Sequence, residues 1–179
     1  GELQLATGAR LELAQVIEVN LTAVLYLTRC ALDVMPDGGA IINISSLAGK
    51  MPFAMQGAYC ASKAGLRAFS MALREELAPR DIRVLCVNPG PVDTDFFGDV
   101  RQAADLTFSQ PMSTVEEVTA VTFDGLHRNL AEVDLPYMSG KLATLGYLIP
   151  GFKRMLRPFL ERIGARNKAR YLRKKGLVP

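Results

Sequence analysis

Ile41-Ile42-Asn43-Ile44-Ser45-Ser46 and, beginning thirteen residues after its last serine, Tyr59-Cys60-Ala61-Ser62-Lys63 decide the fold of this chain. The first stretch belongs to a short apolar run, typical of a buried strand, which we expect over Ala40 to Ser45. The second lies near the start of a helix expected over Ala58 to Leu77, and its tyrosine and lysine, four residues apart, share one helix face. A serine, a tyrosine and a lysine are therefore expected to meet at one end of a strand.

Three such side chains can move a proton to or from a carbonyl oxygen. Alone, the Tyr/Lys pair is a weak pattern, because a lysine on an apolar helix face usually extends its ammonium to water. With a serine in place, a catalytic interpretation is favoured. The Lys63 charge stabilises the Tyr59 phenolate and lowers its pKa, so that Tyr59 serves as acid and base near neutral pH. Ser46 then hydrogen-bonds the substrate oxygen.

A second copy of the Tyr/Lys spacing, Tyr137 to Lys141, lacks this context. Asp124 stands thirteen residues before Tyr137, where the first copy has its serine, and no strand-like run precedes it. Gly140 disfavours a helix at this point. We expect no catalytic role for the second copy.

Asn20 interrupts the apolar stripe of a helix expected from Leu11 to Leu32. A buried amide must be hydrogen-bonded, or it costs about 1–3 kcal/mol. Among lone buried asparagines, a bond to a neighbouring backbone carbonyl is the commoner case. The residues by themselves therefore do not require Asn20 to be catalytic.

A second strand is expected over Ile82 to Val87, ended by Pro89-Gly90-Pro91. A strand, a helix and a strand in this order imply a right-handed crossover and parallel pairing. Ser46 and the segment Pro89 to Thr94 then lie at the carboxyl ends of their strands, where ligands bind in open α/β sheets.

Apolar residues are expected around this edge of the sheet, and they indicate a pocket for a carbonyl or alcohol on a hydrophobic skeleton. Its candidate substrate contacts, besides Ser46, are Leu47, Phe53, Met55, Phe96 and Phe97. The alternative is that most of the aromatic residues only pack a helix onto the sheet. That helix is expected over Ser113 to Leu130, with Ser113-Thr114-Val115-Glu116 as its capping box.

Four segments come in the order seen in short-chain dehydrogenases/reductases, and the chain resembles that family from about Val16 to Thr94. They are Val19-Asn20-Leu21, Asn43 to Gly49, Tyr59 to Lys63, and Val87 to Thr94. By this resemblance, Tyr59 is the catalytic acid/base, Lys63 lowers its pKa and binds the nicotinamide ribose, and Ser46 orients the substrate. Asn20 would hold the water that links Lys63 to solvent.

The same resemblance implies an NAD(P)-dependent oxidoreductase that interconverts a carbonyl and an alcohol, with NAD or NADP as cofactor and no preference readable. The expected cofactor contacts are Ile44, Tyr59, Lys63, Pro89, Gly90, Pro91, Val92 and Thr94. The family usually pairs subunits through the helices that carry Asn20 and Tyr59, so the resemblance also implies a homo-oligomer.

The chain departs from the family at its beginning, since no Gly-rich turn for a pyrophosphate is found in the sequence. The fold class expected is α/β, a Rossmann-type parallel sheet with flanking helices that lacks its N-terminal βαβ units. Either the chain is a fragment of a longer polypeptide or it is a natural short form. We favour the fragment, because the strand over Ala40 to Ser45 would otherwise leave an apolar edge unpaired. The rival to an enzyme is a catalytically incompetent truncated form that acts as a membrane-surface or subunit-interaction module.

Composition fits a single α/β unit in a reducing compartment. With 49% hydrophobic and 22% charged residues, the 179-residue chain can bury a core, and it contains no uninterrupted apolar run long enough to span a membrane. Cys30, Cys60 and Cys86 are odd in number and widely spaced, which indicates buried free thiols and a cytoplasmic protein. The only histidine, His127, is expected on the surface, so no metal site is expected.

The C-terminal end differs from the rest in charge. Lys153 to Pro179 holds ten Lys/Arg and one Glu, a formal charge of +9, whereas the first 152 residues carry −6. We therefore divide the chain into a body, 1–152, and a basic amphipathic tail, 153–179. The tail is interpreted as a helix that docks onto its own domain or a sister subunit or, slightly less favoured, as a peripheral membrane contact. Nothing in it favours nucleic acid.

Overall fold

The computed structural model describes residues 10–54, 56–97 and 100–177. Their centre is a parallel sheet in which β2 (Arg83–Pro89) lies between β1 (Ala40–Ile44) and β3 (Glu132–Leu135). The register pairs Ile44 with Val87, and Val87 with Val133. This arrangement confirms the predicted α/β class and the predicted parallel pairing of the first two strands.

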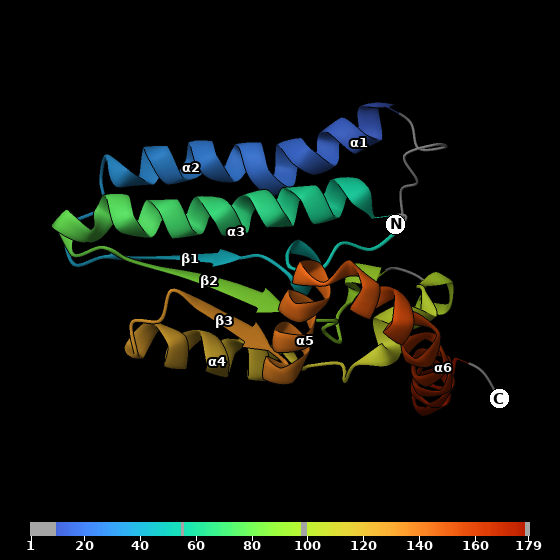
Figure 1. Cartoon of the computed structure of the whole chain (residues 1–179). Coiled ribbons are helices and arrows are strands. Elements are labelled where there is room, and N and C mark those ends of the chain that lie inside the picture. Colours follow the sequence, from blue (N-terminus) through green and yellow to red (C-terminus); the bar gives the residue numbers. More distant parts are fainter. Residues whose placement is uncertain (1–9, 55, 98–99, 178–179) are drawn as a thin grey trace.

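Helices cover both faces of the sheet (Figure 1). On one face, α3 (Gly57–Leu77) packs against β1 and β2, and α1 (Arg10–Ile17) and α2 (Ala23–Leu32) lie beyond it. On the other face, α4 (Val115–His127) packs against β2 and β3. The helices α5 (Tyr137–Leu148) and α6 (Pro150–Lys174) lie beyond the end of the sheet to which the strands point. Short 3-10 turns complete the described elements: η2 Leu47–Gly49, η3 Ala78–Arg80, η4 Asp95–Phe97, η5 Val100–Gln102 and η6 Asp105–Ser109.

The core lies between α3 and the sheet, because both present apolar residues at matching periods. Leu73, Leu77, Ile82 and Val84 form its buried cluster. Burying each such side chain contributes about 1.5–3 kcal/mol. The central strand β2 is covered on both faces, which is why its residues read as a continuous apolar run.

Strand β1 differs from the prediction in length and burial. It ends at Ile44 rather than Ser45, and Ile42 and Ile44 are 37% and 45% exposed. The expectation of a fully buried strand is wrong because, within the described ranges, β1 pairs only with β2 and is an edge strand. The unpaired apolar edge of this strand was the reason for expecting the chain to be a fragment of a longer polypeptide.

The helix predicted over Leu11 to Leu32 is present but not uniform. Between α1 and α2 the backbone forms a wider π-helical turn, η1 (Glu18–Thr22), with Asn20 at its centre. Leu27, which helical spacing places on the apolar stripe of this helix, is 69% exposed. Thr28 is the buried residue of α2 instead.

Other local predictions need correction. The capping box of α4 begins one residue later than expected: Thr114 Oγ1 accepts from the N–H of Glu117, whose carboxylate accepts from the N–H of Thr114. Gly140 does not prevent a helix but lies inside α5. Cys30 is exposed, whereas Cys60 and Cys86 are buried as predicted. His127 is exposed as predicted.

The C-terminal helix α6 docks onto the segment that follows β2. Asn167 Nδ2 donates to the carbonyl of Phe108 at 3.0 Å, and Lys168 Nζ lies 3.3 Å from an Asp105 carboxylate oxygen. Tyr171 donates its hydroxyl proton to Asp93 at 2.6 Å, which together with Lys175 lowers the Asp93 pKa. One face of the predicted tail therefore packs against its own chain.

Candidate active site

The hydroxyl of Ser46 lies where β1 and β2 end. Ser46 caps η2 in an extended conformation, and its Oγ accepts from the N–H of Ala48 at 3.1 Å. The same oxygen is 3.4 Å from the carbonyl of Pro89, to which it donates. The sequence prediction that Ser46 and the Pro89 turn share one edge of the sheet is therefore confirmed.

Tyr59, in the first turn of α3, has its phenol near the Ser46 hydroxyl. Burial, the largest influence, raises the pKa of the Tyr59 phenol, and the Ser46 side chain opposes that rise. The sequence analysis expected Lys63 to lower this pKa. In this structure the Tyr59 pKa is raised, because burial destabilises the phenolate more than the Ser46 side chain stabilises it.

Lys63 lies one helical turn after Tyr59, with its Nζ 5.9 Å from the centre of the Tyr59 ring. The ammonium donates to the carbonyl of Ile44 at 2.9 Å, and burial lowers the Lys63 pKa. Ser45 Oγ donates to the carbonyl of Lys63 at 2.8 Å, which holds α3 against the end of β1. Lys63 thus binds a strand-end carbonyl instead of extending freely into water.

Asn20 joins this group through a serine that the sequence analysis missed. Its Nδ2 donates to Ser62 Oγ at 3.3 Å, and Ser62 Oγ donates to the carbonyl of Tyr59 at 2.8 Å. Ser62 is fully buried. The contact that the structure shows for Asn20 is thus with a side chain, not with the backbone carbonyl of the alternative interpretation, and its role in holding a water stays a prediction. The sequence feature that could have indicated Ser62 is a small polar residue on the face of α3 that packs against η1.

The expected cofactor segment leaves β2 and crosses toward β3. The N–H of Gly90 donates to the carbonyl of Leu135 at 2.6 Å, and Pro91 is buried. Val92 forms an isolated bridge with Ser113. Thr94 is exposed, and its Oγ1 accepts from the N–H of Phe96 at 3.4 Å.

The expected substrate residues divide into three groups. Leu47 is buried beside Ser46, and Phe53 is half-buried. The Phe96 ring centre lies 6.0 Å from that of Tyr59, although Phe96 is 66% exposed. Met55 and the side chain of Phe97 lie outside the part of the structure that is described. The apolar pocket stays a prediction.

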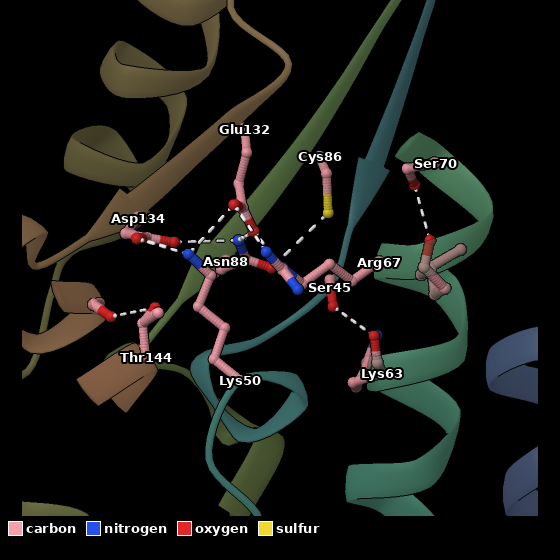
Figure 2. Close-up of polar contacts among 12 residues, drawn as sticks. Ser45, Lys50, Lys63, Arg67, Ser70, Cys86, Asn88, Glu132, Asp134 and Thr144 are labelled. Atoms are coloured by element: carbon pink, nitrogen blue, oxygen red, sulfur yellow. Dashed lines mark hydrogen bonds and ion pairs between the residues drawn. The ribbon is translucent and has the colours of Figure 1, made fainter. Parts of the chain in front are cut away.

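A buried charged cluster next to the site was not predicted (Figure 2). Lys50, which follows η2, is 2.8 Å from Asp134 and 3.1 Å from Glu132 on β3. Asn88 Nδ2 on β2 donates to both carboxylates, at 3.0 Å to Asp134 and 2.6 Å to Glu132.

Arg67 of α3 pairs with Glu132 as well. Burial, the largest influence, acts to raise the Glu132 pKa, but Arg67 and Lys50 together hold it lower than usual. This charged cluster ties the Ser46 loop and the strand before Pro89 to β3.

Within the described ranges, no three His, Cys, Asp or Glu residues lie where they could hold a metal ion. In the same ranges, no helix is both long and apolar enough to cross a membrane.

Comparisons with known proteins agree with this geometry. A family model described as short chain dehydrogenase matches residues 5–105. Nodulation protein G of Rhizobium sp. (strain N33) is 40% identical over 134 residues, which make up 70% of this chain and 52% of that protein. The chain thus spans about half the length of this curated relative.

Two solved structures extend the comparison. A short chain dehydrogenase from Burkholderia cenocepacia J2315, in complex with NADP, matches 88% of this chain and 65% of its own with a TM-score of 0.71 and 24% identity. The angucycline C-6 ketoreductase LanV with bound NADP matches 74% of this chain and 56% of its own, with a TM-score of 0.64 and 25% identity. The parallel sheet and flanking helices are therefore of the Rossmann type found in these proteins.

Proposed function

This chain belongs to the short chain dehydrogenase family, and from that membership we propose that it carries the catalytic half of an NAD(P)-dependent oxidoreductase. The proposed reaction interconverts a carbonyl and an alcohol. The observation that carries the proposal is the position of the Lys63 ammonium, which is held by the carbonyl of Ile44 and lies 5.9 Å from the centre of the Tyr59 ring, with Ser46 near the same phenol.

The proposed roles follow from these contacts. In reduction, the Tyr59 hydroxyl donates its proton to the carbonyl oxygen, and the Ser46 hydroxyl hydrogen-bonds the same oxygen as negative charge develops on it. In oxidation, the proton returns to Tyr59. Lys63 stabilises the phenolate so formed, and Asn20 supports the backbone of Tyr59 through Ser62.

The residues present fit the nicotinamide end of the cofactor. A lysine ammonium beside the phenol suits a ribose hydroxyl, and the turn from Pro89 to Thr94 offers backbone groups at the carboxyl end of β2. Ile44 contributes its carbonyl, which already holds Lys63. When bound, the nicotinamide supplies or accepts the hydride. The ketoreductase LanV holds NADP, and the choice between NAD and NADP is left to measurement.

We assign an apolar substrate to the site. Leu47 is buried next to Ser46, and the Phe96 ring lies beside Tyr59. These side chains would contact a hydrophobic skeleton while its oxygen meets the two hydroxyls.

A single tyrosine substitution tests the mechanism. Tyr59→Phe removes the proton donor, so kcat/KM with a panel of apolar ketones and NADH or NADPH should fall by about 10²-fold or more. Tyr137→Phe is the matched control, because Tyr137 also precedes a lysine by four residues but is 63% exposed on α5. Equal activity of the Tyr59→Phe variant and the unmutated chain contradicts the assignment.

One observation favours the rival, a non-enzymatic interaction module. The β1 edge exposes Ile42 and Ile44, as expected of a sheet that must bind a further strand. Titration with NADH and NADPH, followed by reduced-nicotinamide fluorescence, separates the two functions. Saturable binding supports the enzyme, whereas a folded sample that binds neither cofactor and turns over no ketone favours the interaction module.

A further inference from the structure

Helix α5 buries its small residues and exposes its large apolar ones. Its buried residues are the small ones, Gly140, Ala143 and Gly146. A Cβ at Gly140 would lie 2.1 Å from an Asp134 carboxylate oxygen, so the backbone of α5 lies directly on β3. The small residues let the helix approach the sheet closely, and the large side chains are left on the outer face.

That outer face is apolar and continuous. Successive gaps of one, four, three and three residues place its members on one side of α5. They are Tyr137, Met138, Leu142, Leu145 and Leu148, all between 39% and 70% exposed, with Lys141 among them. The exposed run continues through Tyr147 and Ile149 into α6.

The exposed side of α6, the next helix in the chain, is apolar at first and then basic. Met155 and Phe159 are exposed, and Arg162 and Arg166 follow on the same stripe at helical spacing. The opposite side of α6 holds Asn167, Lys168 and Tyr171, which bind residues 93–108. One side of α6 thus binds the rest of the chain, and the other side is exposed.

Positive charge borders the apolar residues. Residues 137–179 contain eleven of the 21 Lys/Arg of the chain but only one of its 18 Asp/Glu. In the part of the chain that the structure describes, no ion pair involves the exposed arginines of α6 at positions 154, 162, 166, 170 and 173. These charges are therefore not used to hold the fold together.

We propose that the outer faces of α5 and of α6, as far as Arg166, form a docking surface for an anionic phospholipid bilayer. Tyrosine, leucine, methionine and phenylalanine side chains enter the boundary between headgroups and acyl chains, and the arginines bind the lipid phosphates and serine headgroups. Both helices lie in the plane of the surface.

Charge decides between a bilayer and a second copy of the chain. A twofold interface places the same patch of each subunit against the other. Here it would bring Lys141 and the exposed arginines of α6 against an identical set. An anionic surface instead complements the positive charge, so the bilayer is the occupant we assign.

The test uses sedimentation with sucrose-loaded vesicles of phosphatidylcholine, with and without about one third phosphatidylserine. The unmutated chain should bind the anionic vesicles and lose binding as salt is raised. Met138→Ser/Leu148→Ser, which changes two of the most exposed residues of the surface, should bind at least about tenfold more weakly. Phe123→Ser is the matched control, because Phe123 is 60% exposed on α4, outside this surface, and should not affect binding.

A charge-reversal pair gives a second readout. Arg162→Glu/Arg166→Glu should weaken binding to anionic vesicles at least about tenfold, while Arg128→Glu, at the residue that follows α4, should not. Circular dichroism should show unchanged helix content in all these variants, since each changed side chain is exposed. Equal binding by variants and controls overturns the proposal.

The proposal is also overturned if Met138→Ser/Leu148→Ser has a lower molecular mass than the unmutated chain in sedimentation velocity without vesicles, because the surface is then an interface between copies of the chain. No cofactor or turnover enters either assay, so failure here leaves the proposed oxidoreductase function untouched.

Discussion

The three cysteines differ in burial, and the difference determines how reactive we expect each thiol to be. Cys30 is exposed on α2, while Cys60 and Cys86 are buried. Burial, and next the charge of Glu132, raises the pKa of the Cys86 thiol to about 11. Since the thiolate is the reactive form, Cys86 is protected both by its low exposure and by its protonation.

Thiol labelling should therefore distinguish these residues. At pH 8, iodoacetamide should modify Cys30 rapidly and Cys86 only after unfolding, as read by peptide mass spectrometry. Because the Cys86 pKa is raised in the folded state, the folded chain keeps a proton that the unfolded chain loses. Its contribution to stability is present below about pH 8.5 and is lost as pH rises toward 11. Rapid labelling of Cys86 in the folded chain would contradict the structure, and Cys30→Ala is the control for the fast phase.

Tyr59, Lys63 and Ser46 could be placed from sequence because each follows from a local pattern. Helical spacing fixes the first two on one face, and an apolar run ending in serines fixes the third at a strand end. Ser62 could not be assigned in this way. Its role depends on the close approach of η1 to α3, where Gly65 packs against Leu21.

At the scale of elements, the charged cluster joins the loop after β1 to β2, β3 and α3. Lys50 and Asp134 are separated by 84 positions in the sequence. No periodicity connects residues so far apart, which is why the cluster was not predicted. The same reasoning explains Gly140, whose place inside α5 is favoured by contact with Asp134 rather than by helix propensity.

Lys50→Met should destabilise the chain by about 3–5 kcal/mol, because it leaves two buried carboxylates with less positive charge nearby. Urea unfolding at pH 7 measures this difference. Lys141→Met is the matched control, because the Lys141 side chain is exposed on α5, and it should change the free energy of unfolding by less than about 0.5 kcal/mol.

The pH dependence of the Lys50→Met effect has a defined sign. The lowered Glu132 pKa means that the stability it contributes is present above the usual carboxyl range and is lost as pH falls through the folded-state value. The effect should shrink below about pH 4. An equal effect of the two substitutions at pH 7 would show that the cluster does not stabilise the fold.

At the scale of the whole molecule, α2 presents apolar residues away from the sheet. Tyr26 and Leu27 are 70% and 69% exposed, and Val19 and Leu25 are exposed beside them. A helix face of this kind is suited to an identical face on a second copy. It supports the homo-oligomer implied by the family resemblance, which remains a proposal.

Sedimentation velocity tests this interface. The unmutated chain should sediment as a dimer or larger assembly, and Tyr26→Arg/Leu27→Arg should reduce its mass by at least half, because two buried cations would oppose each other across the axis. Val34→Arg is the control, since Val34 is 85% exposed in the turn after α2. A monomer at every concentration, or a mass unaffected by the double substitution, would contradict the assignment.

The attachment of α6 to the segment after β2 bears on how this protein can diversify. Asn167 and Lys168 donate to the carbonyls of Phe108 and Ala103, groups that every residue type possesses. These two bonds therefore place no requirement on the side chains of Ala103 and Phe108. Selection can vary the residues near Phe96, and with them the shape offered to a ligand, while the backbone stays tethered.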